Sequence, residues 1–195
     1  MVASVLRERE AVPFRVSRRR FLRGVLIGVP AAVALGGPGR AVASTRDERS
    51  LEFFNTHTGE TAKAAYFKAG RYCEDVLAGF DHLLRDHRSG DTARIDRSLF
   101  DLLHEVAMLS GKDARFEVIS GYRSPATNAM LNARSSGVAR RSLHMEGRAI
   151  DIRLTGYRTD RLRDLALSLE AGGVGFYRKS DFVHLDTGRF RTWAG

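Results

Sequence analysis

The segment Ser142-Leu-His-Met-Glu-Gly-Arg-Ala-Ile-Asp151 is the feature around which this sequence is best understood. It sets an imidazole, His144, and a carboxylate, Asp151, seven residues apart, with a glycine between them at which the chain can turn. A second suitable imidazole, His184, follows 33 residues after Asp151. Two neutral imidazoles and one carboxylate, with a fourth position left to water, form the ligand set of a catalytic zinc ion. The sequence therefore predicts that these three side chains converge.

The residues that follow this segment have the alternation of β-strands. In 148–154 the large apolar residues Ile150, Ile152 and Leu154 take one face, and Asp151 points away from that face. The segments 174–177 and 182–186 predict two further strands joined by a turn, and His184 lies on the opposite face of its strand from Val183. A hairpin of this kind can bring His184 beside Asp151, with the loop that carries His144 above them.

The rest of the chain predicts a hairpin, four helices and one more strand. Ser124 followed by Pro125 is typical of a helix start, with an N-cap and proline at the first helical position. The predicted hairpin pairs 51–55 with 64–68, the strand covers 115–119, and the helices cover 75–90, 96–110, 127–134 and 159–170. The loop 135–141 is basic and leads into the segment of His144.

The net charge of +9 does not predict a nucleic-acid-binding protein. Eight of the 32 basic residues and only two of the 23 acidic ones lie in residues 1–43, which leaves 24 basic and 21 acidic residues beyond them. Most of the excess charge therefore belongs to the leader. The single cysteine, Cys73, excludes an intrachain disulfide and a zinc site built of cysteines, and we expect it to be a small, partly buried residue.

Residues 1–43 predict a twin-arginine signal peptide. Ser-Arg-Arg-Arg-Phe-Leu at 17–22 precedes a short apolar run, 24–35, and the small residues Ala-Val-Ala at 41–43 form a cleavage site. The apolar run is too short to span a bilayer comfortably, although an uncleaved inner-membrane anchor is the alternative interpretation. We expect the mature domain, 44–195, to lie in the periplasm, with no membrane association after cleavage.

Five motifs along the mature chain resemble one family of proteins. They are Asn-Thr-His-Thr-Gly-Glu at 55–60, Leu-Arg-Asp-His-Arg at 84–88, Ile-Ser-Gly-Tyr-Arg-Ser-Pro at 119–125, Gly-Gly-Val-Gly-Phe-Tyr at 172–177 and Phe-Val-His-Leu-Asp-Thr-Gly at 182–188. Together with the segment of His144, they resemble the zinc D-Ala-D-Ala metallopeptidases, and within these the exported murein endopeptidases of the MepK type. The resemblance covers roughly residues 48 to 193. It implies an α+β fold of the Hedgehog/DD-peptidase kind, in which a small antiparallel sheet carries the zinc site and packs against helices.

The resemblance also implies a substrate and a set of roles. The substrate is peptidoglycan, through its stem peptides or cross-links, and the reaction is metal-assisted hydrolysis of an amide. The zinc ligands are His144, Asp151 and His184, and Arg123 matches the arginine that stabilises the oxyanion. Zinc lowers the pKa of a bound water to about 7 and polarises the carbonyl.

The position of the general base departs from the common pattern of the family. Many relatives have glutamate three residues before the second histidine, where this chain has Asp181. We predict that Asp181 is the base. The alternative is Asp186, which shares a strand face with His184 and can instead orient that imidazole.

Two other functions remain open at this point. One is a non-catalytic peptidoglycan-binding module of the same fold, and the other is a secreted zinc hydrolase that acts on some other small peptide or amide. We expect the bond that is cut to depend on the groove around Tyr122, Tyr177 and the 135–141 loop.

Overall fold

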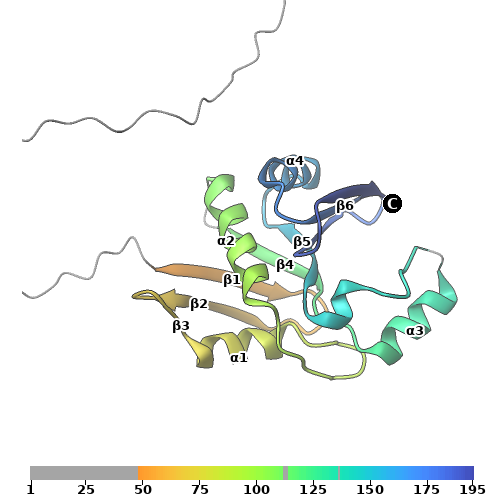
Figure 1. The fold of residues 1–195 in the computed structure, drawn as a ribbon, viewed down its shortest axis with the longest axis horizontal. Helices are drawn as coiled ribbons and strands as arrows, with labels where there is room; N and C mark the ends of the chain where they lie inside the picture. Colours follow the sequence, from red (N-terminus) through yellow and green to blue (C-terminus); the bar gives the residue numbers. More distant parts are fainter. Residues whose placement is uncertain (1–47, 112–113, 136) are drawn as a thin grey trace, which may run out of the picture. The chain divides into compact units, whose positions relative to one another are not determined.

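A computed structural model describes residues 48–195 of the chain, apart from 112–113 and 136 (Figure 1). The predicted signal peptide, 1–43, and its cleavage site lie outside the described residues. Within the described part of the chain, no helix combines the length and the apolar character that crossing a membrane requires.

Most of the strands and helices occur where the sequence patterns predict them. The described strands are β1 (Arg49–Asn55), β2 (Thr61–Lys68), β3 (Arg71–Tyr72), β4 (Arg115–Ser120), β5 (Ala149–Leu154), β6 (Gly173–Tyr177), β7 (Phe182–Asp186) and β8 (Arg191–Ala194). The described helices are α1 (Glu74–Leu83), α2 (Arg97–Ser110), α3 (Pro125–Arg134), α4 (Thr159–Leu169) and the short 3-10 helix η2 (Leu143–Glu146). The predicted α+β class is confirmed.

The sheet is larger than predicted and is not purely antiparallel. Its eight strands follow the order β3-β2-β1-β4-β5-β7-β6-β8. The pairs β1/β4 and β6/β8 are parallel, and the other pairs are antiparallel. The long connection that contains α1 and α2 allows the chain to return and form β4 parallel to β1. The edge strands β3 and β8 are too short to show a clear alternation, which is why the sequence did not predict them.

One face of the sheet is covered by α1, α2 and α4, and it holds the hydrophobic core. Phe53 of β1 contacts Phe80 of α1, Phe100 of α2 and Phe116 of β4, with ring centroids 5.0, 6.4 and 5.9 Å apart. The buried alternate residues of β5 and β7, among them Ile152 and Val183, continue this layer beneath α4. The other residues of β5 and β7 must therefore point to the opposite face of the sheet.

Two helices begin and end at the residues that the sequence indicates. The Asp96 carboxylate accepts a hydrogen bond from the Ser98 N–H at the start of α2, and Gly111 ends this helix at φ 66°. At α3 the Ser124 hydroxyl accepts a hydrogen bond from the Thr127 N–H, and proline occupies the first helical position.

Helix α1 ends earlier than predicted, at Leu83 rather than near residue 90. The Leu84 carbonyl accepts a hydrogen bond from the Tyr122 N–H at 2.7 Å, and the buried Asp86 carboxylate accepts one from the Ser124 N–H at 3.0 Å. The chain thus leaves the helix to hold the segment between β4 and α3. These long-range partners override the local helical pattern.

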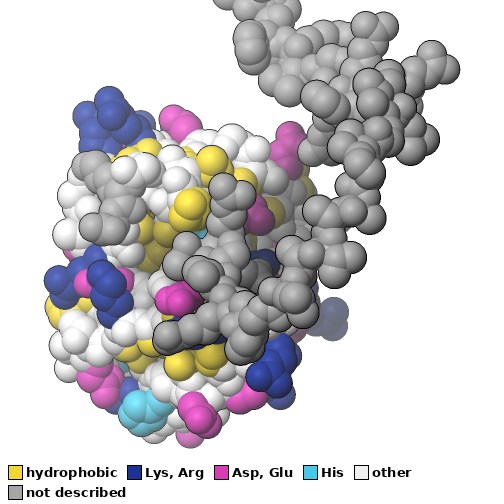
Figure 2. Space-filling model, turned by 90° about the vertical axis from the view of Figure 1, so that its left-hand side faces the viewer, with side chains coloured by type: hydrophobic (Ala, Val, Ile, Leu, Met, Phe, Trp, Pro, Cys, Tyr) yellow, Lys and Arg dark blue, Asp and Glu magenta, His cyan; other side chains and the backbone are white. Residues whose placement is uncertain are grey.

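Basic and acidic side chains are interspersed with hydrophobic ones on the face shown in Figure 2. Pairs at the surface include Lys63 with Glu52 and Arg49 with Asp101, each at 2.8 Å. Exposed ion pairs of this kind contribute little to stability, so the free energy of folding rests mainly on the core between the sheet and the three helices.

Candidate metal centre

Asp151 and His184 are placed side by side by the register of two antiparallel strands. In the β5/β7 pair, Asp151 lies directly opposite His184. Both side chains lie on the sheet face opposite the core, because they alternate with Ile152 and Val183. The hairpin of β6 and β7 that the sequence predicts is present, with Tyr177 paired to Phe182 at its turn.

His144 reaches the same place from η2. The Ser142 hydroxyl accepts a hydrogen bond from the His144 N–H at 3.4 Å at the start of this helix, and Gly147 ends it at φ 65°, a conformation that favours glycine. The Arg123 N–H donates to the His144 carbonyl at 3.1 Å. The backbone of His144 is therefore held on both sides, independently of the contacts that its side chain makes.

The three expected ligand atoms converge at distances suited to one metal ion. His144 Nε2 lies 3.2 Å from His184 Nδ1 and 3.3 Å from Asp151 Oδ1, and His184 Nδ1 lies 2.8 Å from Asp151 Oδ1. Tetrahedral zinc with bonds of about 2.0–2.1 Å requires ligand atoms about 3.3 Å apart. The three residues are buried, and among the described residues they are the one group found that could hold a metal ion.

The ring nitrogens that point away from this cluster each have a fixed acceptor. His144 Nδ1 lies 2.7 Å from the Gly121 carbonyl, and His184 Nε2 lies 3.0 Å from Asp186 Oδ2. Each acceptor requires a proton on the nitrogen that it contacts, so the other nitrogen presents its lone pair to the cluster. Such outer contacts orient metal-binding histidines and fix their tautomers.

Burial and charge act differently on the three ionisable groups. Burial raises the pKa of Asp151, but His144 and His184 outweigh it, and the net effect is a lowered pKa that keeps the carboxylate charged. Burial lowers the pKa of His144, which favours the neutral ligand form. Burial also acts to lower the pKa of His184, yet Asp151 and Asp186 together raise it. The two carboxylates thus favour positive charge at this point, which a bound cation supplies.

Arg123 lies beside the cluster, and several of its N–H donors have only a distant partner or none within the described part of the chain. Its Nη2 atom is 3.7 Å from Asp151 Oδ2, and its hydrogen bonds to Asn128 and Ser120 are long, at 3.4 Å each. Its Nε atom is buried without a partner among the described residues. Buried polar groups are nearly always hydrogen-bonded, so these free donors are available to an oxygen atom of a ligand in the cavity.

Asp186 is held in contact with His184 by a set of hydrogen bonds. Its side chain is fully buried and accepts hydrogen bonds from the His184 ring, from the N–H groups of Gly173 and Gly188, and from two nitrogens of Arg191. The lowered pKa of this carboxyl reflects these contacts, which outweigh its burial. The contact with His184 Nε2 is the one that the alternative interpretation of Asp186, as an orienting residue, requires.

The structure does not bring the Asp181 carboxylate to the metal cluster, and its role as the general base stays a prediction. The Asp181 carboxylate accepts a hydrogen bond from the Thr159 hydroxyl at 2.5 Å and is exposed beside Arg153. It lines a separate depression next to the start of α4. Asp181 lies in the turn before β7, at φ 52°, where the alternation of the strand no longer applies, and its side chain is held there by Thr159 and Arg153.

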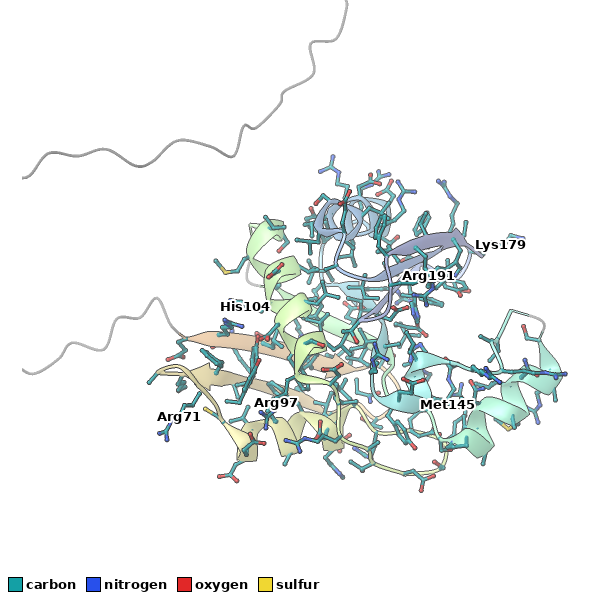
Figure 3. The ribbon with its side chains drawn as sticks, viewed as in Figure 1. Arg71, Arg97, His104, Met145, Lys179 and Arg191 are labelled. Carbon is teal, nitrogen blue, oxygen red and sulfur yellow. The ribbon has the colours of Figure 1, made fainter. Side chains whose placement is uncertain are left out.

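The cluster opens into a cavity of about 330 Å³. The cavity is lined by the three cluster residues together with Arg123, Gly137, Val138, Ala139, Arg141, Ser142, Leu143, Tyr177, Phe182, Arg191 and Trp193. Figure 3 labels Arg191 at the start of β8 and Met145 on η2, whereas His104 lies apart on α2. Tyr177 lines the cavity, as do Gly137, Val138, Ala139 and Arg141 of the 135–141 loop, whereas Tyr122 packs against the core.

The sequence comparisons identify the family. The family model described as peptidoglycan L,D-endopeptidase MepK matches residues 43–193. The chain belongs to this family. It is 43% identical over 182 residues to the peptidoglycan L,D-endopeptidase MepK of Escherichia coli K12, covering 92% of this chain and 98% of that protein. It is 40% identical over 156 residues to the probable MepK of Haemophilus influenzae, covering 80% and 84% of the two chains. No solved structure matches the chain significantly.

Membership of the MepK family confirms the resemblance that the motifs indicated, and with it the peptidase class. Two wall residues of the cavity, Arg191 and Trp193, were not found by sequence reasoning. Both lie on the short strand β8, where Trp193 is 5.1 Å from the His184 ring and donates a hydrogen bond to the Tyr177 hydroxyl at 3.0 Å. The only signal in the sequence was the single tryptophan of the chain, close to the C-terminus.

Proposed function

We propose that this protein is a zinc-dependent peptidase that hydrolyses amide bonds in the stem peptides or cross-links of peptidoglycan. The observation that carries the proposal is the convergence of His144 Nε2, His184 Nδ1 and Asp151 Oδ1 within 3.3 Å of one another, each imidazole held by an acceptor on its far side. The cavity that opens over this cluster leaves room for a substrate and a water molecule.

The donor set fits zinc through its chemistry as well as its spacing. Two imidazole nitrogens and one carboxylate oxygen are common ligands of catalytic zinc, and three protein ligands leave a position open. When bound, zinc would supply an activated water and polarise the scissile carbonyl. Asp151 and the two histidines would hold it, and the outer contacts of Gly121 and Asp186 would keep both rings aligned.

Arg123 supplies the second element of the mechanism. Its guanidinium lies on the cavity wall, and its donors are only weakly engaged. We propose that these donors bind the carbonyl oxygen of the scissile amide as negative charge develops on it. Fixed donors at that position stabilise the transition state without reorganisation.

The printed names of the relatives favour one kind of bond. Because they are named L,D-endopeptidases, we propose that this protein cuts a peptidoglycan amide between an L and a D centre. The direct link between two diaminopimelate residues is such a bond. The substrate and the leader together favour a location in the periplasm, reached through the twin-arginine pathway with cleavage near residue 43.

Release of muropeptides tests the proposal directly. The zinc-loaded protein is incubated with purified sacculi, and the soluble products are identified by mass spectrometry. We expect cross-linked muropeptides to be converted to monomers by the wild type and not by His144→Ala. A non-catalytic binding module, the alternative function, would bind sacculi and release nothing. Equal cleavage by His144→Ala would show that the ligand assignment is wrong.

A further inference from the structure

The wall of the cavity carries one guanidinium whose charge is not compensated. Three arginines line the cavity, and Asp151 is the one carboxylate among its lining residues. Arg123 lies 3.7 Å from Asp151, and Arg191 is bound by the Asp186 carboxylate at 2.7 Å. Arg141 is exposed and has no ion pair or hydrogen bond to its side chain within the part of the chain that the structure describes. Its charge is therefore available to a ligand.

The backbone beside Arg141 is anchored on both sides. The buried Asn128 side chain donates hydrogen bonds to the Ala139 carbonyl at 3.1 Å and to the Arg140 carbonyl at 3.2 Å. On the other side, buried Ser142 starts η2, which carries His144. The long arginine side chain thus projects from a fixed point only three residues before a metal ligand, on the wall of the same cavity.

We propose that Arg141 binds a free carboxylate of the substrate close to the scissile amide and so selects acidic peptides. This inference rests on the proposed function and names the group that the site recognises. A guanidinium matches a carboxylate with two parallel hydrogen bonds, and such charge-assisted bonds are about twice as strong as neutral ones. In peptidoglycan, diaminopimelate linked through one amine keeps a free carboxylate on the carbon next to the amide nitrogen, and amidation of that carboxylate removes its charge.

A comparison of two substrates with three variants tests the role of Arg141. The synthetic substrates are diaminopimelate-linked peptides that differ in one group, a free carboxylate or a carboxamide beside the scissile bond. The zinc-loaded full chain is assayed as wild type, Arg141→Met, Arg141→Lys and Arg140→Met. Arg140 is the matched control because it is exposed on the same loop but does not line the cavity.

We expect the wild type to have a KM for the acid about tenfold below that for the amide, as one well-placed ionic hydrogen bond provides. Arg141→Met should lose this preference through a higher KM for the acid alone, with kcat nearly unchanged. Arg141→Lys should restore part of the preference, and Arg140→Met should keep all of it. Zinc content should be equal in all four proteins.

Two results would overturn the inference. Either Arg141→Met keeps the preference of the wild type, or its KM rises equally for both substrates, which would indicate a purely structural role of the loop. Calorimetric binding of the corresponding acid and amide product peptides makes the same comparison without turnover. If the wild type cleaves neither substrate, the proposed function fails, and the binding comparison still decides whether Arg141 recognises the carboxylate.

Discussion

Replacing Asp186 by asparagine should weaken zinc binding although Asp186 is not itself a ligand. The carboxylate accepts hydrogen bonds from His184, Gly173, Gly188 and Arg191, and every one of these contacts is with a donor. Asparagine keeps one acceptor oxygen and introduces an NH₂ group, which is itself a donor. Whichever way the amide is oriented, an N–H group faces another donor in a fully buried site.

The size of the effect follows from these contacts. Loss of an outer partner of a metal-bound histidine costs about 10–100-fold in metal affinity, or about 1.4–2.8 kcal/mol. We expect the upper half of that range, because the change also removes a negative charge next to His184 and leaves Arg191 without its carboxylate. Since Arg191 is partly exposed to water, the metal-free protein should lose only about 1–2 kcal/mol of stability.

Competition with a chromophoric chelator at fixed pH measures the zinc dissociation constant. Asp181→Asn is the matched control, because Asp181 is exposed and hydrogen-bonds to Thr159 outside the metal cavity. Its zinc affinity should equal that of the wild type. The reasoning fails if folded Asp186→Asn binds zinc as tightly as the wild type, or if Asp181→Asn weakens zinc binding to the same extent.

Three further predictions concern catalysis, pH and packing. Arg123→Ala should lower kcat about 10²–10³-fold while zinc content is retained, and loss of zinc instead would contradict the proposed oxyanion role. The pKa of Asp86 is lowered because hydrogen bonds from backbone N–H groups and neighbouring hydroxyls outweigh the effect of burial, which raises it. This carboxylate therefore stabilises the fold above its unfolded pKa of about 3.9, and the contribution is lost as the pH falls toward the lower folded value. Asp86→Asn should accordingly melt below the wild type at pH 7, with a difference that shrinks below about pH 4; a constant difference across this range would count against it. A β-carbon at Gly172 would lie 1.7 Å from the Asp186 carbonyl oxygen, so Gly172→Ala should destabilise the fold by about 1–3 kcal/mol in thermal melts. Gly79→Ala, in an exposed helix position with nothing within 4 Å, should instead stabilise it by up to about 1 kcal/mol, and equal melting of the two variants would refute the packing argument.

Much of the site could be predicted from the sequence because its signals are local. Alternation along 149–154 and 182–186 determined which side chains leave the apolar face, and this placed Asp151 and His184 together on the open face of the sheet. The N-cap at Ser124 and the αL glycine at Gly111 likewise need only their own neighbours. The ligand set and the family motifs could therefore be identified from the sequence.

Only the tertiary structure decided where the two neighbouring carboxylates lie. Asp181 and Asp186 stand on either side of the same histidine in the sequence, yet one hydrogen-bonds to Thr159 at the start of α4 and the other is buried against His184. Arg191 completes the second arrangement from a strand too short to predict. Periodicity states which face a side chain takes, but its partner depends on segments that are distant in sequence, and those meet only when the sheet has formed.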